Sequence, residues 1–310
     1  MSVDMLLDLF AAALRIATPL MWAALGGIIS ERAGVFAIGL EGMMLAGAFG
    51  AAVATVLSGI PFLGVLAASA CGAAMGLFIA IVTVRYGADN IVTGLSANIL
   101  AVGLTSFLVR AIIGHGSAPR IHLNVLQPID IPFLVSIPKI GPILFSQPPI
   151  TYVVLLALIP LSLVLNRTQI GLTMRATGEN PMTVFAIGRH PAAIRQWCVI
   201  ASGAIAGIGG SVLVLQQVGT FTDNMVAGRG YLALASIIVG RWKPFATVGA
   251  CLIFGAAEAL YLRVEILGVP ISSYYMQMLP YLIAIIVLVT LGRSARLPAA
   301  IGTIFQREGH

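Results

Sequence analysis

The sequence contains few charged residues. Only 9% of its 310 residues are Asp, Glu, Lys or Arg, whereas soluble domains carry about 25%. Hydrophobic residues make up 59% of the chain, and the mean hydropathy is +1.02. A chain with so few charges cannot cover the surface of a soluble globular domain, so the composition predicts an integral membrane protein.

Lysine is almost absent, and this excludes one class of enzyme. The only lysines are Lys139 and Lys243, and neither lies in the Gly-Lys-Ser/Thr context of a phosphate-binding loop. The chain therefore cannot hydrolyse ATP by that route. It also contains no HExxH motif and no recognisable nucleophile elbow. We expect a non-catalytic protein with no catalytic residues.

Cysteine is also scarce, and the few cysteines lie in apolar runs. Cys71, Cys198 and Cys251 behave there as small hydrophobic residues. Neither a disulfide framework nor metal-ligand spacing is present, so we expect no metal site and no cofactor. The net charge of +6 reports membrane topology and does not indicate a nucleic-acid partner.

Long apolar runs account for most of the chain. A hydrocarbon core about 30 Å thick needs about 20 apolar residues per helical span. The length therefore predicts a single transmembrane domain over residues 1–310, an all-α bundle of roughly eight to ten spans with broken or re-entrant segments. The expected spans are 5–29, 33–58, 62–84, 91–109, 150–165, 197–218, 231–240, 245–262 and 276–291.

Two expected spans are ambiguous. The first contains Arg15 and could be a span with a polar stripe or an interfacial helix followed by a shorter span. Residues 231–240 are too few to cross alone, unless they extend back through residues 221–230 or form a half-helix beside a break. Residues 110–149 are rich in proline and glycine and predict a folded or partly re-entrant external loop.

A polar island over residues 166–196 separates two apolar runs. Asn180 is a good N-cap, and Pro181 suits the first helical position. Gly188 can adopt the left-handed conformation that ends a helix, and His190-Pro191 begins the next one. The island thus predicts a helix of about two turns, whose apolar face carries Met182, Val184, Phe185 and Ile187. Such a helix is either a docking element or an interfacial helix without a partner.

The amino-acid sequence of this island resembles that of a known protein family. Gly178-Glu179-Asn180-Pro181 followed by Ala186-Ile187-Gly188 resembles the cytoplasmic loop in permease subunits of bacterial ABC importers. The branched-chain amino acid and simple-sugar permease superfamily, and its nucleoside branch in particular, is the most similar. Gly39-Leu40-Glu41-Gly42-Met43-Met44 is also similar to an early signature of that branch. The resemblance covers nearly the whole chain.

The resemblance implies a function and a set of partners. The loop would form a coupling helix that docks on a separate ABC ATPase through Gly178, Glu179, Asn180, Pro181, Phe185, Ala186 and Gly188. A second permease, identical or homologous, would complete the pathway, and an extracytoplasmic substrate-binding protein would deliver a nucleoside or simple-sugar-like solute. Membrane lipid surrounds the chain, which would lie in the bacterial plasma membrane.

Five polar residues within apolar runs are candidates for lining the substrate pathway: Glu41, Ser96, Asn98, Gln216 and Glu258. An ionisable residue in a span by default faces a partner or water. Glu41 could instead be wetted by the membrane interface, and Ser96 and Asn98 could bridge helices structurally.

The distribution of basic residues predicts the orientation. If residues 166–196 are cytoplasmic and the spans alternate, eleven basic residues fall in cytoplasmic segments: Arg32, Arg85, Arg167, Arg175, Arg189, Arg195, Arg241, Lys243, Arg293, Arg296 and Arg307. Five fall in external segments: Arg110, Arg120, Lys139, Arg229 and Arg263. The bias places the island and the C-terminus in the cytoplasm.

Two other functions remain open from the residues alone. An ion-coupled secondary transporter would need ionisable groups within the membrane, and Glu41, Glu258 and Arg15 are available. Its transport would follow an ion gradient and survive loss of the ATPase. A channel or scaffold would not require the helix between Gly178 and Gly188.

Overall fold

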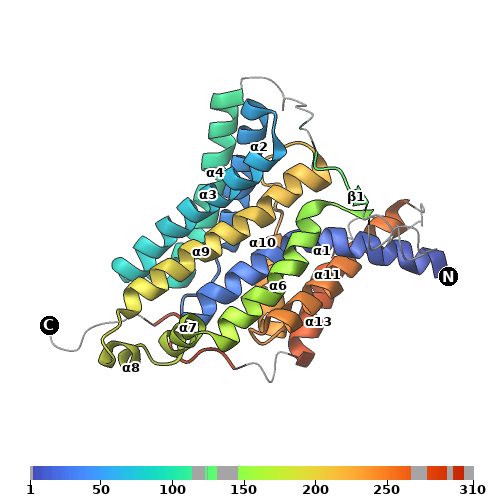
Figure 1. The fold of residues 1–310 in the computed structure, drawn as a ribbon. Helices are drawn as coiled ribbons and strands as arrows, with labels where there is room; N and C mark the ends of the chain where they lie inside the picture. Colours follow the sequence, from blue (N-terminus) through green and yellow to red (C-terminus); the bar gives the residue numbers. More distant parts are fainter. Residues whose placement is uncertain are drawn as a thin grey trace.

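The structure is a computed structural model, and it describes residues 3–113, 123, 125–130, 146–266, 278–291 and 296–303. Most of the expected external loop, 110–149, lies outside these residues. The described part is a helical bundle (Figure 1). Its α-helices are α1 (Val3–Arg32), α2 (Leu40–Ser58), α3 (Pro61–Ala80), α4 (Asn90–Ile113), α6 (Pro149–Arg167), α7 (Gln169–Glu179), α8 (Pro181–Ala186), α9 (Pro191–Val212), α10 (Arg229–Val239), α11 (Pro244–Ile266) and α13 (Leu279–Leu291).

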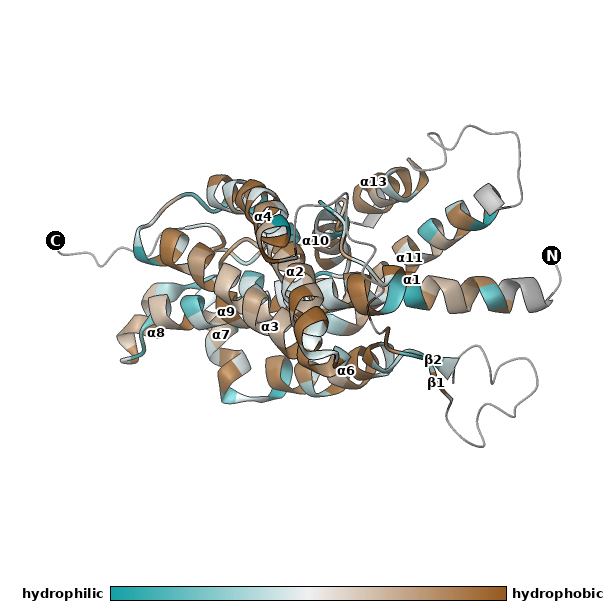
Figure 2. Cartoon of the chain, turned by 90° about the horizontal axis from the view of Figure 1, so that it is seen from above, coloured by the Kyte–Doolittle hydropathy of each residue, from teal (hydrophilic) through white to brown (hydrophobic). Residues whose placement is uncertain are grey.

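Two of these helices continue as π-helix. The segment η1 (Ile81–Arg85) extends α3, and η2 (Leu213–Val218) extends α9. With these extensions, seven helices of the described chain are long and apolar enough to cross a membrane, whereas α10 and α13 are shorter. Figure 2 colours the helices by hydropathy, and brown, hydrophobic residues recur along all of the membrane-length helices. The prediction of an all-α membrane bundle is confirmed.

Close packing between helices depends on small residues. The helix α9 packs against α1, α2 and α3. A Cβ atom added at Gly72 of α3 would lie 2.2 Å from the carbonyl oxygen of Gly203, and one added at Gly207 would lie 2.3 Å from that of Ala68. The small-residue faces expected from the sequence therefore meet each other, because only glycine lets the two backbones approach this closely.

The first helix is one continuous element, so residues 5–29 do not divide into an interfacial helix and a separate shorter span. The helix α1 runs without a break from Val3 to Arg32. Arg15 lies on it and donates from Nε to Gln147 Oε1 at 2.9 Å. Gln147 belongs to β2 (Ser146–Gln147), which pairs antiparallel with β1 (Ile129–Asp130). Arg15 thus anchors β2, the strand that precedes α6.

The short helix α10 resolves the second ambiguity. It has 11 residues and begins beside the first turn of α2, and at its far end Trp242 contacts Glu31 at the end of α1. At about 1.5 Å per residue, the start of α10 lies about 16 Å from that end, roughly half the thickness of a hydrocarbon core. Residues 231–240 are therefore part of a half-helix beside a break.

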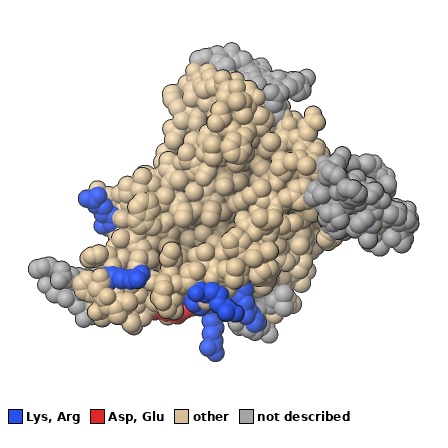
Figure 3. All heavy atoms as spheres, viewed as in Figure 1, with Lys and Arg blue, Asp and Glu red and all other residues tan. Residues whose placement is uncertain are grey.

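One end of the bundle carries α7, α8, the turn at residues 240–243 and the segment 298–303, and we call it the docking end. Hydrogen bonds join these parts: Ala300 N–H donates to Gly178 O at 2.8 Å, and Gly302 N–H donates to Gly34 O at 3.0 Å. In Figure 3 the blue Lys and Arg side chains gather along the lower and left edges, around the region of α7 and α8. The last described residues of the chain thus lie at the same end as α8.

Candidate functional site

The helix α8 has the boundaries that the sequence predicts. Asn180 Oδ1 accepts hydrogen bonds from the N–H groups of Met182 at 3.0 Å and Thr183 at 3.3 Å. Pro181 occupies the first helical position. Gly188 has a φ of 79°, in the left-handed region, and its N–H donates to Phe185 O at 2.9 Å. The predicted caps are confirmed, because each depends only on local chain chemistry.

The faces of α8 divide into an inner and an outer side. Val184 is buried and holds the helix on the bundle. Met182 is 40% exposed and Ile187, just beyond the helix, is 69% exposed, while Phe185 is half-buried. The apolar surface available to a partner is therefore centred on Met182 and Ile187, with Phe185 at its edge.

The remaining predicted docking residues occupy different positions. Glu179, Asn180, Ala186 and Gly188 are exposed, and Pro181 is half-buried. Gly178 is buried, and a Cβ atom there would lie 2.3 Å from the carbonyl oxygen of Arg32. Gly178 therefore does not reach the surface, and its contribution is to let α7 pack against the end of α1.

A buried arginine that the sequence did not single out as a site residue connects the parts of the docking end. The Arg195 guanidinium donates to three carbonyl oxygens: Ala33 O at 3.2 Å, Ala300 O at 3.1 Å and Thr303 O at 2.6 Å. Glu179 Oε2 accepts from Ala299 N–H at 3.3 Å. The segment 298–303 is thus fastened to both α9 and the end of α7.

The turn between α10 and α11 joins the same end. Arg32 donates from Nε and Nη2 to Trp242 O at 3.3 and 3.1 Å. The buried Glu31 carboxylate accepts from Trp242 Nε1 at 2.5 Å and from Ala37 N–H at 3.3 Å. Since Trp242 follows α10 directly, the half-helix and α8 are connected through the end of α1.

A second polar group lies where α2 and α10 begin, and we call Glu41, Asn98, Arg229, Tyr231 and Glu258 the polar centre. The buried Glu41 carboxylate accepts from Gly228 N–H through Oε1 and from Gly230 N–H through Oε2, both at 2.7 Å. These amides belong to the first turn of α10, whose dipole favours a negative charge there. Glu41 therefore anchors the half-helix, and only 6% of this residue is exposed.

Asn98 links α4 to the starts of α2 and α10. Its Oδ1 accepts from Gly42 N–H at 2.8 Å, and its Nδ2 donates to Ile38 O at 3.0 Å and to the Tyr231 hydroxyl at 2.9 Å. All these partners lie within the first turn of α2 or α10 or just before it. Asn98 is thus a helix bridge whose partners lie at the breaks of the two helices.

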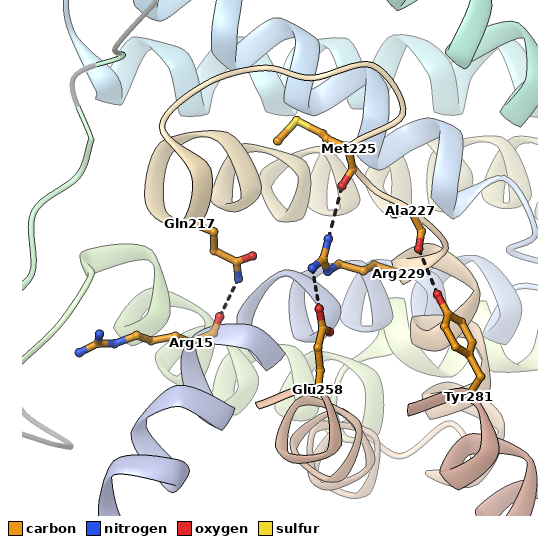
Figure 4. A network of polar contacts seen from close by, with 7 residues as sticks. All are labelled: Arg15, Gln217, Met225, Ala227, Arg229, Glu258 and Tyr281. Carbon is orange, nitrogen blue, oxygen red and sulfur yellow. Dashed lines mark hydrogen bonds and ion pairs between the residues drawn. The ribbon is translucent and has the colours of Figure 1, made fainter. Parts of the chain in front are cut away.

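Figure 4 shows the third part of the polar centre. Arg229 donates from Nη2 to Glu258 Oε1 at 2.6 Å and from Nη1 to Met225 O at 3.3 Å. The Tyr281 hydroxyl donates to Ala227 O at 3.1 Å. A pocket of about 330 Å³ lies beside these groups and is lined by Ala227, Arg229, Leu232, Glu258, Tyr261, Pro280 and Tyr281.

The structure brings three of the five predicted pathway residues together and leaves two apart. Glu41, Asn98 and Glu258 all connect to the first turn of α10. Ser96 is exposed on the outer face of α4. Gln216 lies on η2, and no hydrogen bond in the described part of the chain joins it to the polar centre.

The polar centre also includes Arg229. The alternation of spans predicts an external segment for Arg229, and the structure adds that its side chain is paired inside the bundle. Arg229 is the first residue of α10, with its side chain 22% exposed and paired to Glu258. The signal in the sequence was the pair of glycines on either side of it, because Gly230 lets the backbone approach Glu41 closely and Gly228 adopts a φ of 87°.

Comparison with known proteins identifies relatives along nearly the whole chain. Residues 9–288 match the family described as the permease component of branched-chain amino acid transport systems. The chain is 36% identical over 309 residues to the guanosine ABC transporter permease protein NupQ of Bacillus subtilis, covering 97% of both chains. It is 33% identical over 297 residues to the nucleoside ABC transporter permease protein NupC of Lactococcus lactis, covering 92% of each.

A third relative is named for a different solute. The chain is 33% identical over 267 residues to the putative glucose ABC transporter permease protein TsgC13 of Haloferax volcanii, covering 85% of this chain and 80% of the relative. No solved structure matches the chain. With a family match that covers most of the bundle and relatives of nearly equal length, the chain belongs to the branched-chain amino acid transport permease family and is a multi-pass permease subunit of an ABC transporter.

Proposed function

We propose that this chain is the permease subunit of an importer for a nucleoside or simple-sugar-like solute in a bacterial plasma membrane. The proposal is supported most by the near full-length similarity to two permeases named for nucleosides or guanosine. In the complete transporter, ATP hydrolysis belongs to a separate ATPase, and an extracytoplasmic binding protein delivers the solute. A second permease chain, identical or homologous, completes the pathway.

Docking of the ATPase is assigned to α8. An exposed apolar helix end, built on the segment that joins α7 to α9, gives a partner a small protruding surface with Met182 and Ile187 on its outer side. The docking end then faces the cytoplasm, together with the segment 298–303. The basic side chains around α7 and α8 agree with this orientation.

Conformational coupling follows from the contacts of the docking end. Movement of α8 by the ATPase would be passed through Gly178 to the end of α1 and from there through Trp242 to α10. The other end of α10 is the polar centre, so a displacement at the docking end shifts the groups beside the pathway. Rigid-body motion of packed helices is an ordinary mode for such switches.

The ion-coupled alternative receives less support from the geometry of the acids. Glu41 accepts two backbone hydrogen bonds, and Glu258 is paired with Arg229. Both carboxylates thus have structural partners that favour a fixed charge, whereas an ion-coupling carboxylate must exchange its ion during each cycle.

The docking proposal is tested with Ile187→Asp. A charge at this exposed position should release the ATPase from membranes and abolish uptake, while the permease stays inserted. Leu57→Asp is the matched control, because Leu57 is 75% exposed near the far end of α2. Normal uptake and ATPase retention in Ile187→Asp would overturn docking through α8.

The substrate proposal is tested by uptake into cells that produce the complete transporter. Labelled guanosine, glucose and leucine are compared at equal concentration, with an ATPase-deficient transporter as the blank. ATPase-dependent uptake of guanosine or glucose supports the proposal and identifies the solute class. Uptake of leucine alone, or uptake that follows an ion gradient without the ATPase, contradicts it.

A further inference from the structure

A long apolar groove lies on the side of the bundle, next to the docking end. Its volume is about 430 Å³, and it lies between α6 and α9, with Ile29 of α1 at its floor and α7 across one end. Its lining residues are Ile29, Leu161, Val164, Leu165, Ile170, Thr173, Met174, Arg189, Ala193, Ile194, Trp197, Cys198 and Ala201. Both α6 and α9 pack against α1, which leaves the groove between them.

The chemistry of the groove changes along its length. Between Ala193 and Ala201 of α9 the lining extends for about 12 Å, and it is apolar. The one cationic side chain of the lining, Arg189, lies at the end of the groove beside α7 and donates to Thr173 Oγ1 at 3.1 Å. In the described part of the chain, Arg189 has no carboxylate within ion-pair distance.

The surroundings of the groove are those of a surface that contacts lipid. Trp197 is 70% exposed, Ile170 66% and Leu163 54%. Tryptophan is enriched where a membrane surface meets water. A polar solute would leave its hydroxyl groups unpaired against this lining, whereas a hydrocarbon chain would not.

We propose that this groove binds an anionic phospholipid, with an acyl chain between α6 and α9 and the phosphate at Arg189. The charge of Arg189 complements the phosphate, and a guanidinium can present two parallel donors to its oxygens. The lipid would contact α7 on one side and α9 on the other, and these are the helices on either side of α8. It would thus brace the base of the coupling helix from the membrane side.

Trp197 provides a direct test, because it lies in the groove. The purified chain is placed in phosphatidylcholine vesicles that contain, at equal mole fraction, brominated phosphatidylglycerol or brominated phosphatidylcholine. Bromine quenches nearby tryptophan, and the other two tryptophans, Trp22 and Trp242, are 6% and 2% exposed. Trp197→Phe defines their background signal.

The expected result is a preference for the anionic lipid of about fivefold at Trp197, from the attraction that one basic residue exerts near a membrane surface. Arg189→Ala should reduce this preference to about one. Lys243→Ala is the matched control, because Lys243 is an exposed cation of the docking end outside the groove, and it should keep the preference.

Equal quenching by the two lipids in the unmodified protein would overturn the proposal, and so would a preference that survives Arg189→Ala. A second measurement addresses the acyl chain: Ala201→Phe fills the groove without removing the cation. Native mass spectrometry of this variant should show fewer retained phosphatidylglycerol molecules than the unmodified protein, and unchanged retention would place the lipid elsewhere. Neither readout depends on ATPase docking or on the identity of the solute.

Discussion

The docking end and the polar centre are built on opposite principles. At the docking end, α8 is bounded by residues within ten positions of each other, from Asn180 to Gly188. In the polar centre, Glu41 binds amides 187 and 189 residues further along the chain. A short helix can therefore be defined by local chemistry, whereas a helix that starts inside a membrane bundle needs side chains from distant segments to accept from its free N–H groups.

The two regions also differ in how they tolerate change. The backbone at the start of α10 has no space around it, since a Cβ atom at Gly230 would lie 2.5 Å from the backbone nitrogen of Glu41. A Cβ atom at Gly188 would meet nothing within 4 Å, so a substitution there would cost only the strain of its left-handed backbone. We therefore expect substitutions in the polar centre to cost more than substitutions in α8, and the predictions below test that ranking from the largest effect to the smallest.

The largest effect is expected for Gly230→Ala. The added methyl group would push α10 away from α2, and overpacking of this kind costs about 1–3 kcal/mol even where neighbours can move. The melting temperature in detergent should fall, and uptake should be abolished. The matched control is Gly249→Ala on α11, where a Cβ atom meets nothing within 4 Å. If both variants melt alike, the close approach of α2 and α10 is not what positions the half-helix.

The next effect separates the charge of Glu41 from its size. Glu41→Ala leaves two amide donors of α10 without their acceptor, and leaving buried donors unsatisfied costs about 1–3 kcal/mol. Glu41→Gln keeps one acceptor oxygen and should lose about half as much. Thermal unfolding of the two variants measures the order. Glu179→Gln is the control, because Glu179 is exposed. Equal stability of Glu41→Ala and the unmodified protein would contradict an anchoring role.

A smaller effect on folding, with a larger effect on coupling, is expected for Arg195→Lys. Lysine keeps the charge, but it cannot reproduce the planar geometry by which the guanidinium reaches the carbonyl oxygens of Ala33, Ala300 and Thr303. The segment 298–303 should then become more accessible to proteases, and uptake per bound ATPase should fall. An unchanged cleavage pattern would show that Arg195 does not hold this segment.

The smallest effect is expected for Asn180→Ala. Loss of an N-cap costs about 1 kcal/mol, and a six-residue helix held by Val184 can fray without unfolding the bundle. Uptake should fall several-fold while the melting temperature stays nearly unchanged, and Asn180→Asp should restore uptake because aspartate also caps. A drop in melting temperature as large as that of Gly230→Ala would remove the contrast between the two regions.

The candidate site could be predicted from the sequence where its chemistry is local or its residue type is rare in a membrane. Asn180, Pro181 and Gly188 predicted the bounds of α8 correctly. Glu41, Asn98 and Glu258 stood out because polar residues in apolar runs need partners, and they do connect at one place. Ser96 is also a polar residue in an apolar run, but it is exposed. The sequence could not predict this, because one hydroxyl group does not show which face of a helix is buried.

The remaining site residues could not be predicted because their roles depend on long-range contacts. The pairing of Arg229 with Glu258 could not be predicted, because the two residues lie 29 positions apart on different helices. The motif predicts that Gly178 contacts the ATPase, whereas in the structure Gly178 is buried against the end of α1. Arg195 belongs to a polar loop in sequence, yet it is buried and binds a segment about 105 positions away.

Composition is enough to identify the chain as a helical membrane protein, because 59% of its residues are hydrophobic and only 9% are charged, too few to cover a soluble surface. The sequence also determined the caps of α8, because capping needs only neighbouring residues. Only the packing of distant segments places the start of α10 halfway through the bundle, with its first amides on the Glu41 carboxylate. That outcome depends on bringing the starts of two helices together from opposite halves of the chain, where the Glu41 side chain of α2 accepts from the backbone N–H groups that α10 exposes.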